Sequence, residues 1–229
     1  MLQELMMSKA ERNFNRRYPH EYNIFRTLFY YSFLYIVVHP FMKIFYDCKI
    51  TGRENLPTKA KSGKFIYTAN HVSHFDPPMV SMACNRPIAY MAKKELFQKG
   101  DKFEWLVKRL GAFAVDRTKP EIATFKTVKD ILSTSWSLGV FPQGGIRPYG
   151  SDISDLKKGF IVIAKNAKAD IVPVAIGEFT GYPKLKPFTR RKVRLHVGKP
   201  ISYKLSEEEI IKQWSEQIAQ HADYKLGEI

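Results

Sequence analysis

The amino-acid sequence predicts one α/β domain, in which helices cover a mixed, largely parallel β-sheet, preceded by an N-terminal amphipathic helical arm. Short β-branched or aromatic runs alternate with helical segments from residue 47 onward, whereas residues 1–46 have a different composition. Such alternation is typical of a sheet covered by helices. Because 45% of the 229 residues are hydrophobic, the chain can bury one sizeable core.

The expected strands are short runs rich in β-branched and aromatic residues, separated by segments of helical periodicity. The strands begin at Lys64, Ile88, Ala112, Leu138, Ile171 and Val193. The helices are expected at residues 77–84, 96–110, 120–135 and 157–168. A last helix follows Ser206, which forms a capping box with Glu209. No repeat or low-complexity linker divides residues 47–229, so we interpret them as one domain.

The arm, residues 1–46, combines a basic segment with an apolar one. Its basic residues are Lys9, Arg12, Arg16, Arg17 and Arg26. Residues 27–42 carry no formal charge but include His39 and Pro40. This stretch is shorter than the roughly 20 apolar residues of a spanning helix, and proline breaks helices. The pattern favours a helix lying in the bilayer interface, against the alternative of a helix packed on the protein's own core. The start of the chain also becomes polar too early for a secretory signal.

The charge balance indicates an anionic partner. Lysine and arginine number 37 against 22 aspartate and glutamate, a formal net charge of +15. An acidic membrane surface and nucleic acid would both suit this charge. Because the aromatic residues gather in the arm and no RNA- or DNA-binding motif is present, we expect no nucleic-acid partner. Cys48 and Cys84 form neither a disulfide framework nor a CxxC pair, which fits a reducing compartment.

The segment NHVSHFDPP, residues 70–78, holds the most informative cluster of polar side chains. His71 is expected on the loop that leaves a strand, and the double proline fixes the start of the next helix. Asp76 would then be the N-cap of that helix. Across a tight loop, one carboxylate oxygen can cap the helix while the other accepts the proton of a His71 ring nitrogen. The second ring nitrogen is then available as a base.

Two other interpretations of this segment remain open from the residues alone. His71, His74 and Asp76 would supply three metal ligands, but the remaining histidines show no ligand-like spacing, so we expect no metal. A capped helix with incidental histidines is the purely structural alternative. Ser73 lacks the glycines of a nucleophile elbow, and Cys84 is expected to serve packing. The histidine would therefore activate a substrate group directly.

Four sequence blocks, in order, resemble those of the glycerolipid acyltransferases, the HxxxxD family that includes the 1-acylglycerol-3-phosphate acyltransferases. The blocks are Asn70-His71-xxxx-Asp76, GAFAVDR (residues 111–117), VFPQGGIR (residues 140–147, usually FPEGTR) and IVPVAI (residues 171–176). The resemblance extends approximately over residues 45–200. It agrees with the α/β domain expected from the strand and helix pattern.

The resemblance implies transfer of an acyl group from a thioester to a hydroxyl group without a covalent acyl-enzyme. His71 would take the proton of the hydroxyl, with Asp76 holding and charging the ring. The attack would create a tetrahedral oxyanion, which needs backbone N–H or cationic donors. Gly144 and Gly145 would let the backbone approach this oxyanion closely.

The resemblance also implies the anion-binding residues. Arg147 and Arg117 would bind the phosphate of lysophosphatidic acid, because guanidinium matches phosphate oxygens bidentately. Lys94 is a weaker candidate for the same anion. For Arg117 the alternative is a surface salt bridge with Asp116 or Glu121. No cofactor is implied, since the acyl group would arrive on coenzyme A or acyl carrier protein, both of which are acidic.

The third block departs from the family pattern at Gln143, where glutamate is usual, and at Gly145, where threonine or serine is common. This loop resembles an acceptor-contacting segment, so other acceptors stay open: glycerol 3-phosphate, another lysophospholipid or an amino-acid lipid. We predict that Gln143→Glu alters acceptor preference more than turnover. A non-catalytic lipid-binding relative is a further alternative, against which the presence of both His71 and Asp76 argues.

A lysophospholipid acceptor gives the arm a role. It would dock the domain on the cytoplasmic face of the cell membrane as a peripheral or monotopic protein, drawn there by its basic surface. The run KLKPFTRRKVR, residues 184–194, is either a second lipid contact or a solvated edge.

Overall fold

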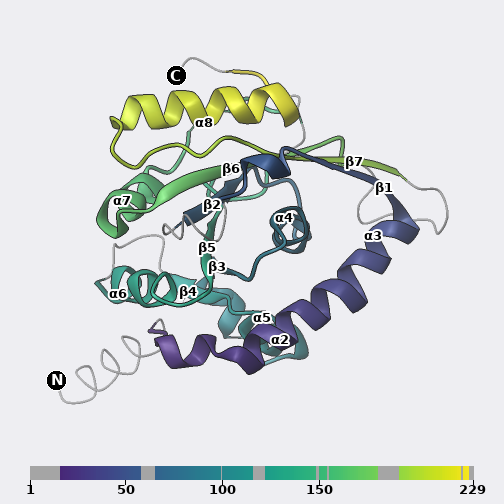
Figure 1. Cartoon of the computed structure of the whole chain (residues 1–229), viewed down its shortest axis with the longest axis vertical. Coiled ribbons are helices and arrows are strands. Elements are labelled where there is room, and N and C mark those ends of the chain that lie inside the picture. Colours follow the sequence, from purple (N-terminus) through teal and green to yellow (C-terminus); the bar gives the residue numbers. More distant parts are fainter. Residues whose placement is uncertain are drawn as a thin grey trace.

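The computed structural model describes residues 16–57, 65–98, 100–115, 122–147, 150–153, 155–179, 191–222 and 224–226. Within them, a seven-stranded sheet lies between two layers of helices (Figure 1). The strand order is β1-β7-β6-β2-β5-β3-β4. The strands are β1 Tyr46–Thr51, β2 Phe65–Ala69, β3 Ile88–Lys93, β4 Phe113–Val115, β5 Ser137–Val140, β6 Asp170–Gly177 and β7 Arg191–Val197.

The sheet is mixed and largely parallel, as predicted. Only the β6–β7 pair is antiparallel among these strand pairs of the described residues, and β1 runs parallel to β7 at the edge. The expected strands of the domain are present, but β1 was not expected. Its sequence, YDCKIT, is mostly polar and alternates exposed with partly buried residues. Pairing with β7, far away in the sequence, rather than local propensity, therefore makes this segment a strand.

Helices cover both faces of the sheet and enclose two apolar clusters. On one face lie α6 (Ile122–Ile131), α7 (Gly159–Ala167) and α8 (Glu207–Ala222). On the other lie α4 (Asp76–Cys84) and the arm. Side chains alternate across a strand, so neighbouring residues of the central strands enter opposite clusters. This two-sided burial holds the strand ends, and the loops that follow them, in fixed positions.

One expected helical segment is present as predicted and another is divided in two. The capping box of α8 is confirmed: Glu209 N donates to Ser206 Oγ at 3.2 Å, and Ser206 N donates to Glu209 Oε2 at 3.0 Å. The single helix expected at residues 96–110 is wrong. The chain instead forms a short 3-10 helix, η5 (Lys94–Phe97), and then α5 (Lys102–Arg109). Asp101 caps α5 through Glu104 N at 2.7 Å, which starts a new helix there.

Among its described residues, the arm starts with η1 (Pro19–Tyr22) and continues as α2 (Ile24–Phe33), the π-helical turn η2 (Leu34–Val38) and α3 (His39–Phe45). The expectation that the apolar stretch is too short to cross a membrane and is broken by proline is wrong. Residues 24–45 form one helix of 22 residues, long and apolar enough to cross a membrane by length and composition. The turn before Pro40 is π-helical, with His39 N–H bonded to Leu34 O. This wider turn accommodates a proline that lacks an N–H.

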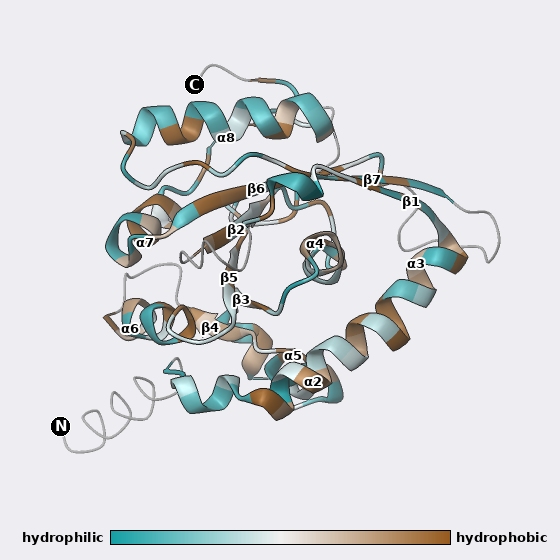
Figure 2. Cartoon of the chain, viewed as in Figure 1, coloured by the Kyte–Doolittle hydropathy of each residue, from teal (hydrophilic) through white to brown (hydrophobic). Residues whose placement is uncertain are grey.

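The arm has two distinct apolar faces. Tyr30, Leu34, Val38 and Met42 recur every fourth residue and are at most 4% exposed against the domain. On the outer side, large apolar residues remain in solvent, and parts of the arm have hydrophobic colouring in Figure 2. The exposed apolar residues of residues 24–45 are Ile24, Phe25, Leu28, Tyr35, Ile36, Val37 and Ile44. The arm thus packs on the protein's own core with one face and leaves the other apolar face uncovered.

Candidate active site

The first and third blocks meet at one edge of the sheet. β2, β5 and β3 are parallel neighbours, so their carboxyl ends point the same way. His71 follows β2, residues 141–147 follow β5, and Lys94 follows β3. In α/β sheets, ligands bind outside the carboxyl ends of the strands. Arg117, after β4, lies outside the described residues.

His71 and Asp76 form a hydrogen-bonded pair across the loop between β2 and α4. His71 Nδ1 lies 2.7 Å from Asp76 Oδ2, and the two side chains are 16% and 0% exposed. The predicted contact across this loop is therefore present. Because Nδ1 is engaged by the carboxylate, the ring is held with Nε2 as its remaining nitrogen. A partly exposed imidazole oriented by a buried carboxylate has the arrangement of a general base.

Asp76 organises the loop rather than capping the helix. Its Oδ2 also accepts hydrogen bonds from Val72 N at 2.7 Å and Ser73 N at 3.0 Å, and Oδ1 accepts from Ser73 Oγ at 2.9 Å. The N-cap assignment was wrong, because α4 begins at Asp76 itself and Phe75 occupies the cap. The physical reason is that the two prolines after Asp76 have no N–H to donate. The carboxylate turns instead to the donors of the preceding loop.

Asn70 fixes the start of the loop to the neighbouring strand. The residue is fully buried, its Nδ2 donates to Ile176 O at 2.9 Å, and its Oδ1 accepts from Ile176 N at 2.8 Å. The side-chain amide thus replaces one rung of backbone pairing between β2 and β6. The sequence placed Asn70 in the first block, but only the structure shows that its side chain joins β2 to β6.

The third block holds the main chain of His71 from both sides. Gln143 Oε1 accepts from His71 N at 2.7 Å, and Arg147 N donates to His71 O at 2.8 Å. Phe141 stacks on the imidazole, with ring centroids 4.2 Å apart and an interplanar angle of 19°. Gln143 was expected to contact the acceptor, but it is 2% exposed and its amide faces the main chain of His71. Its contact with His71 was invisible in the sequence, where the two residues lie far apart.

The two glycines of the third block differ in conformation. Gly144 has φ +66°, and a Cβ there would lie 3.0 Å from Lys157 Cγ. Its N–H bonds to Phe141 O at 3.0 Å and closes a tight turn. Gly145 has no positive φ, and a Cβ built on it would meet no atom within 4 Å. Glycine is therefore strongly favoured at Gly144, whereas the position of Gly145 has room for a side chain.

The basic side chains near this edge have partners within the protein. Arg147 Nη2 lies 3.5 Å from Asp155 Oδ2, and both side chains are largely exposed. Lys157 shares the same carboxylate, with Nζ 3.0 Å from Oδ2. Exposed ion pairs of this kind contribute little to stability, so an anionic ligand can compete for Arg147 at low cost. Lys94 is half-buried at the start of η5.

The C-terminal segment closes behind the third block. Lys225 O accepts from Ile153 N at 2.9 Å, and Asp152 and Lys225 form a parallel bridge. Tyr224, before it, is 5% exposed. Burial raises the pKa of Tyr224, and the neighbouring polar side chains of Asn70, Gln143 and Ser151 offset part of the rise. This contact of residues 224–225 with the site was not predicted from sequence, because the segments involved are far apart along the chain.

The described residues contain no group of three or more His, Cys, Asp and Glu side chains placed to hold a metal ion. His74 is exposed, whereas Asp76 is buried. His196 lies in β7, where its Nδ1 is 2.9 Å from Thr51 Oγ1 and its ring stacks on His221 at 3.5 Å. These contacts support a structural role for His196.

The whole of this edge belongs to a region that matches a known family. Residues 47–177 match the family model of the acyltransferases, Acyltransferase. The chain therefore belongs to the acyltransferase family, as its sequence blocks indicated, and is an enzyme of that class.

The relatives have a more specific name. The 1-acyl-sn-glycerol-3-phosphate acyltransferase of Bacillus subtilis (strain 168) is 34% identical over 157 residues, which make up 67% of this chain and 73% of that protein. Its namesake from Streptococcus pneumoniae (strain ATCC BAA-255 / R6) is 35% identical over 140 residues, 60% of this chain and 50% of that protein. The crystal structure of the 1-acyl-sn-glycerophosphate acyltransferase PlsC from Thermotoga maritima has the same fold, with a TM-score of 0.67 and 27% identity, over 85% of this chain and 78% of that one.

Proposed function

We propose that the protein transfers a fatty acyl group from an acyl thioester to the free hydroxyl of lysophosphatidic acid, and so forms phosphatidic acid in phospholipid biosynthesis. The observation that carries the proposal is the 2.7 Å contact between His71 Nδ1 and the buried Asp76 carboxylate. The pair lies in a chain whose relatives are named 1-acyl-sn-glycerol-3-phosphate acyltransferases.

In the proposed reaction, His71 Nε2 takes the proton of the acceptor hydroxyl while its oxygen attacks the thioester carbonyl carbon. The imidazolium that forms is stabilised by the negative charge of Asp76. When the tetrahedral intermediate collapses, the carbon–sulfur bond breaks and the proton passes from His71 to the departing thiolate. No bond forms between the acyl group and the protein.

The oxyanion and the acceptor phosphate need positive partners. The turn around Gly144 and Gly145 follows directly on β5, the neighbour of β2. Because the Gly144 N–H is bonded to Phe141 O, the Gly145 N–H is the candidate donor for the oxyanion. Arg147 is tied by its own backbone to His71, with Arg147 N 2.8 Å from His71 O. We therefore expect its guanidinium to leave Asp155 and bind the acceptor phosphate. Arg117 and Lys94 are further candidates for the same phosphate.

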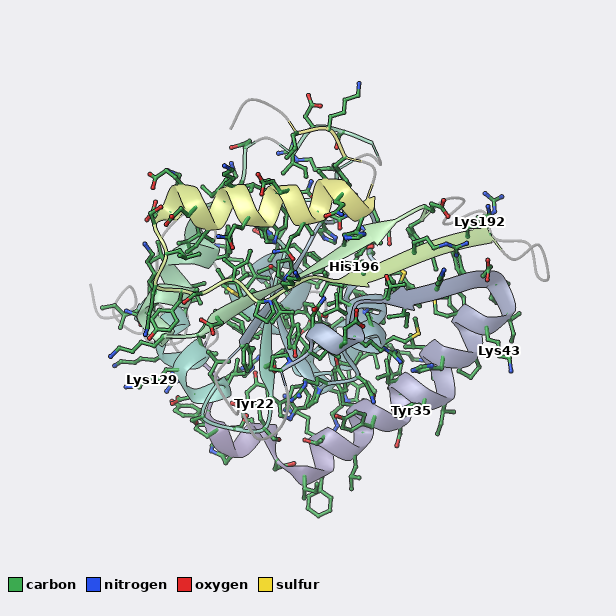
Figure 3. All side chains as sticks on the ribbon, turned by 45° about the horizontal axis from the view of Figure 1, so that its top comes forward. Tyr22, Tyr35, Lys43, Lys129, Lys192 and His196 are labelled. Carbon is green, nitrogen blue, oxygen red and sulfur yellow. The ribbon has the colours of Figure 1, made fainter. Side chains whose placement is uncertain are left out.

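A lipid acceptor requires the protein to work at a membrane. We propose that the arm docks on the bilayer as a monotopic element at the cytoplasmic face. Support comes from its uncovered apolar residues, combined with burial of the opposite face along most of its length. A helix packed lengthwise on the domain can enter one leaflet only by lying in the interface. Lys43, which points outward from α3 in Figure 3, would reach anionic headgroups.

Docking of the arm is tested by flotation with liposomes containing phosphatidylglycerol. The full chain is expected to float, and a variant lacking residues 1–45 is expected to remain in the dense fraction. Because part of the arm is buried against the domain, circular dichroism must first establish that the variant is folded. A folded variant that floats like the full chain would contradict docking through the arm.

The acyl donor is either acyl-coenzyme A or acyl carrier protein, since both are acidic and the chain carries a net charge of +15. A second acceptor class is favoured by one observation, the replacement of the usual glutamate and threonine by Gln143 and Gly145. Glycerol 3-phosphate, other lysophospholipids and amino-acid lipids therefore belong in the acceptor panel.

The reaction is tested with purified protein, lysophosphatidic acid in mixed micelles and labelled acyl-coenzyme A, beside His71→Ala and His74→Ala. We expect product with the parent and with His74→Ala, and none with His71→Ala. Should the parent be inactive with both acyl donors, the remaining acceptors are tested in turn. Activity retained by His71→Ala would refute the assignment of the base.

A further inference from the structure

Helix α5 has its polar and apolar residues arranged unlike those of a helix on a water-facing surface. Its one acidic residue, Glu104, is 7% exposed and turned toward the body of the protein. There its Oε2 accepts from Gly100 N at 2.7 Å, and Oε1 pairs with Lys108. By contrast, Trp105 is 58% exposed. A surface helix usually places carboxylates outward and aromatic rings inward.

The outward face of α5 combines one aromatic with two basic side chains. Lys102, Trp105 and Arg109 are spaced by three and four residues, and therefore share one face of the helix. Lys102 and Arg109 are both exposed. Phe103, 50% exposed, is two residues from Trp105, about 200° around the helix. It therefore projects from a different side.

This face adjoins the uncovered apolar face of the arm. Trp105 meets Phe29 of α2 edge to face, with ring centroids 6.1 Å apart, and the Arg109 guanidinium lies 5.9 Å from the same ring. Phe25, one turn before Phe29, is 78% exposed. α2 and α5 lie side by side in Figure 1. The apolar surface therefore continues from the arm onto the catalytic domain.

Basic groups gather where the two helices meet. Arg26 of α2 donates through Nη1 to Lys108 O at 3.2 Å. Burial lowers the pKa of the Arg26 guanidinium, and the neighbouring Arg17 and Arg109 lower it further, against opposing effects of Tyr22 and Glu21. Cations held this close together favour an anionic partner.

We propose that the Lys102–Trp105–Arg109 face of α5 is a second bilayer-contacting element, which seats Trp105 among the headgroups of anionic lipids beside the arm. Tryptophan with flanking basic residues suits the interface, because the ring lies at the headgroup level and the cations meet lipid phosphates. The inference rests on the proposed docking of the arm. It adds that the catalytic domain itself touches the membrane, through an element that follows β3 and η5 and so limits how the domain can tilt.

Trp105 can serve as an intrinsic fluorescence probe of this contact. Of its three tryptophans, Trp136 and Trp214 are 2% and 0% exposed, whereas Trp105 is 58% exposed. Full-length protein is mixed with vesicles of phosphatidylglycerol and phosphatidylcholine, with or without bromine on the acyl chains. We expect a blue shift of the emission and quenching by the brominated lipid, both lost in Trp105→Phe.

Partitioning onto the same vesicles, measured by flotation, gives a second readout. Lys102→Gln should weaken binding to anionic vesicles about fivefold, since one basic residue near such a surface contributes about 1 kcal/mol. Trp105→Ser should weaken it as well, and the matched variant Phe103→Ser should not. All three positions are exposed, so the folded state is expected to tolerate the changes.

The outcomes separate this inference from the docking of the arm. Flotation of the full chain without quenching of Trp105 would overturn the inference and leave the arm as the anchor. Failure of the full chain to float would contradict both the docking of the arm and the membrane contact of α5. Equal losses for Trp105→Ser and Phe103→Ser would overturn the assigned face. A change in Trp105 emission with acyl carrier protein but not with vesicles would assign the face to a protein partner and overturn the inference.

Discussion

At the scale of single residues, one carboxylate determines the shape of the loop after β2. Asp76 accepts hydrogen bonds from the ring of His71, two backbone N–H groups and the Ser73 hydroxyl. Its position at the first residue of α4 places a buried anion at the positive end of a helix. The loop, the tautomer of His71 and the helix start therefore depend on the same group.

We predict that Asp76→Asn lowers kcat by about 10²–10⁴-fold, the range typical of general acid–base catalysis. The amide has one oxygen and an NH₂ group, so it cannot accept from all of these donors or stabilise an imidazolium by charge. Initial rates, with folding checked by circular dichroism, provide the measurement. His74→Ala serves as the control on the same loop, and an equal loss in both variants would contradict a specific role for Asp76.

Gln143 also acts through a single contact, the hydrogen bond that its Oε1 accepts from His71 N. Gln143→Met would leave the His71 N–H without its acceptor. An unsatisfied buried donor costs about 1–3 kcal/mol in free energy, because the group is out of water and makes no hydrogen bond. We expect lower kcat by the same factor for every acceptor, while Gln143→Glu keeps an oxygen at His71 and retains more of the activity. Steady-state rates over an acceptor panel test this. A change in acceptor preference in Gln143→Met would instead support the acceptor contact expected from sequence.

At the scale of elements, the turn after β5 carries a matched pair of glycines. Gly144 has a positive φ and Lys157 close to its missing Cβ, and Gly145 has neither. Gly144→Ala should lower the free energy of unfolding by about 1–2 kcal/mol, the cost of a left-handed residue with a side chain. Gly145→Ser should change it by less than about 0.5 kcal/mol, as at other open positions. Urea unfolding measures the free energy of unfolding of both variants. Equal losses would contradict the prediction that only Gly144 needs a glycine.

At the scale of the whole molecule, burial of thiol and phenol groups makes stability depend on alkaline pH. Burial raises the pKa of Cys48 from 9.0 to about 11. It also raises the pKa of Cys84 and of Tyr22, Tyr30 and Tyr67. Above pH 9, the unfolded chain loses these protons while the folded protein keeps them. Protons bound more tightly in the folded state stabilise it below the unfolded pKa values, and this stability is lost as pH rises.

The free energy of unfolding should therefore fall between pH 8 and pH 10.5. Urea titrations at several pH values measure it, and Cys48→Ser separates the contribution of one thiol by flattening part of the slope. A free energy that stays constant over this range would show that these groups titrate alike in both states.

The sequence by itself determined the features that depend on local chemistry. β-branched runs predicted the strands from β2 to β7, because strand-forming residues share a preference for half-buried, pleated surfaces. Ser206 and Glu209 predicted the start of α8, because a capping box needs only a four-residue segment. The spacing of His71 and Asp76 predicted their contact, since a tight loop joins them.

Only the tertiary structure decided what depends on partners distant along the chain. β1 is a strand because β7 pairs with it, and Pro40 remains in a helix because a wide turn and the buried face of the arm hold it there. Gln143 positions His71 from another strand, and Asn70 bridges to β6. Such contacts depend on which segments the core brings together, and no single stretch of sequence contains that information. Local propensity therefore predicted the elements and the dyad, while the packing of the sheet decided what supports them.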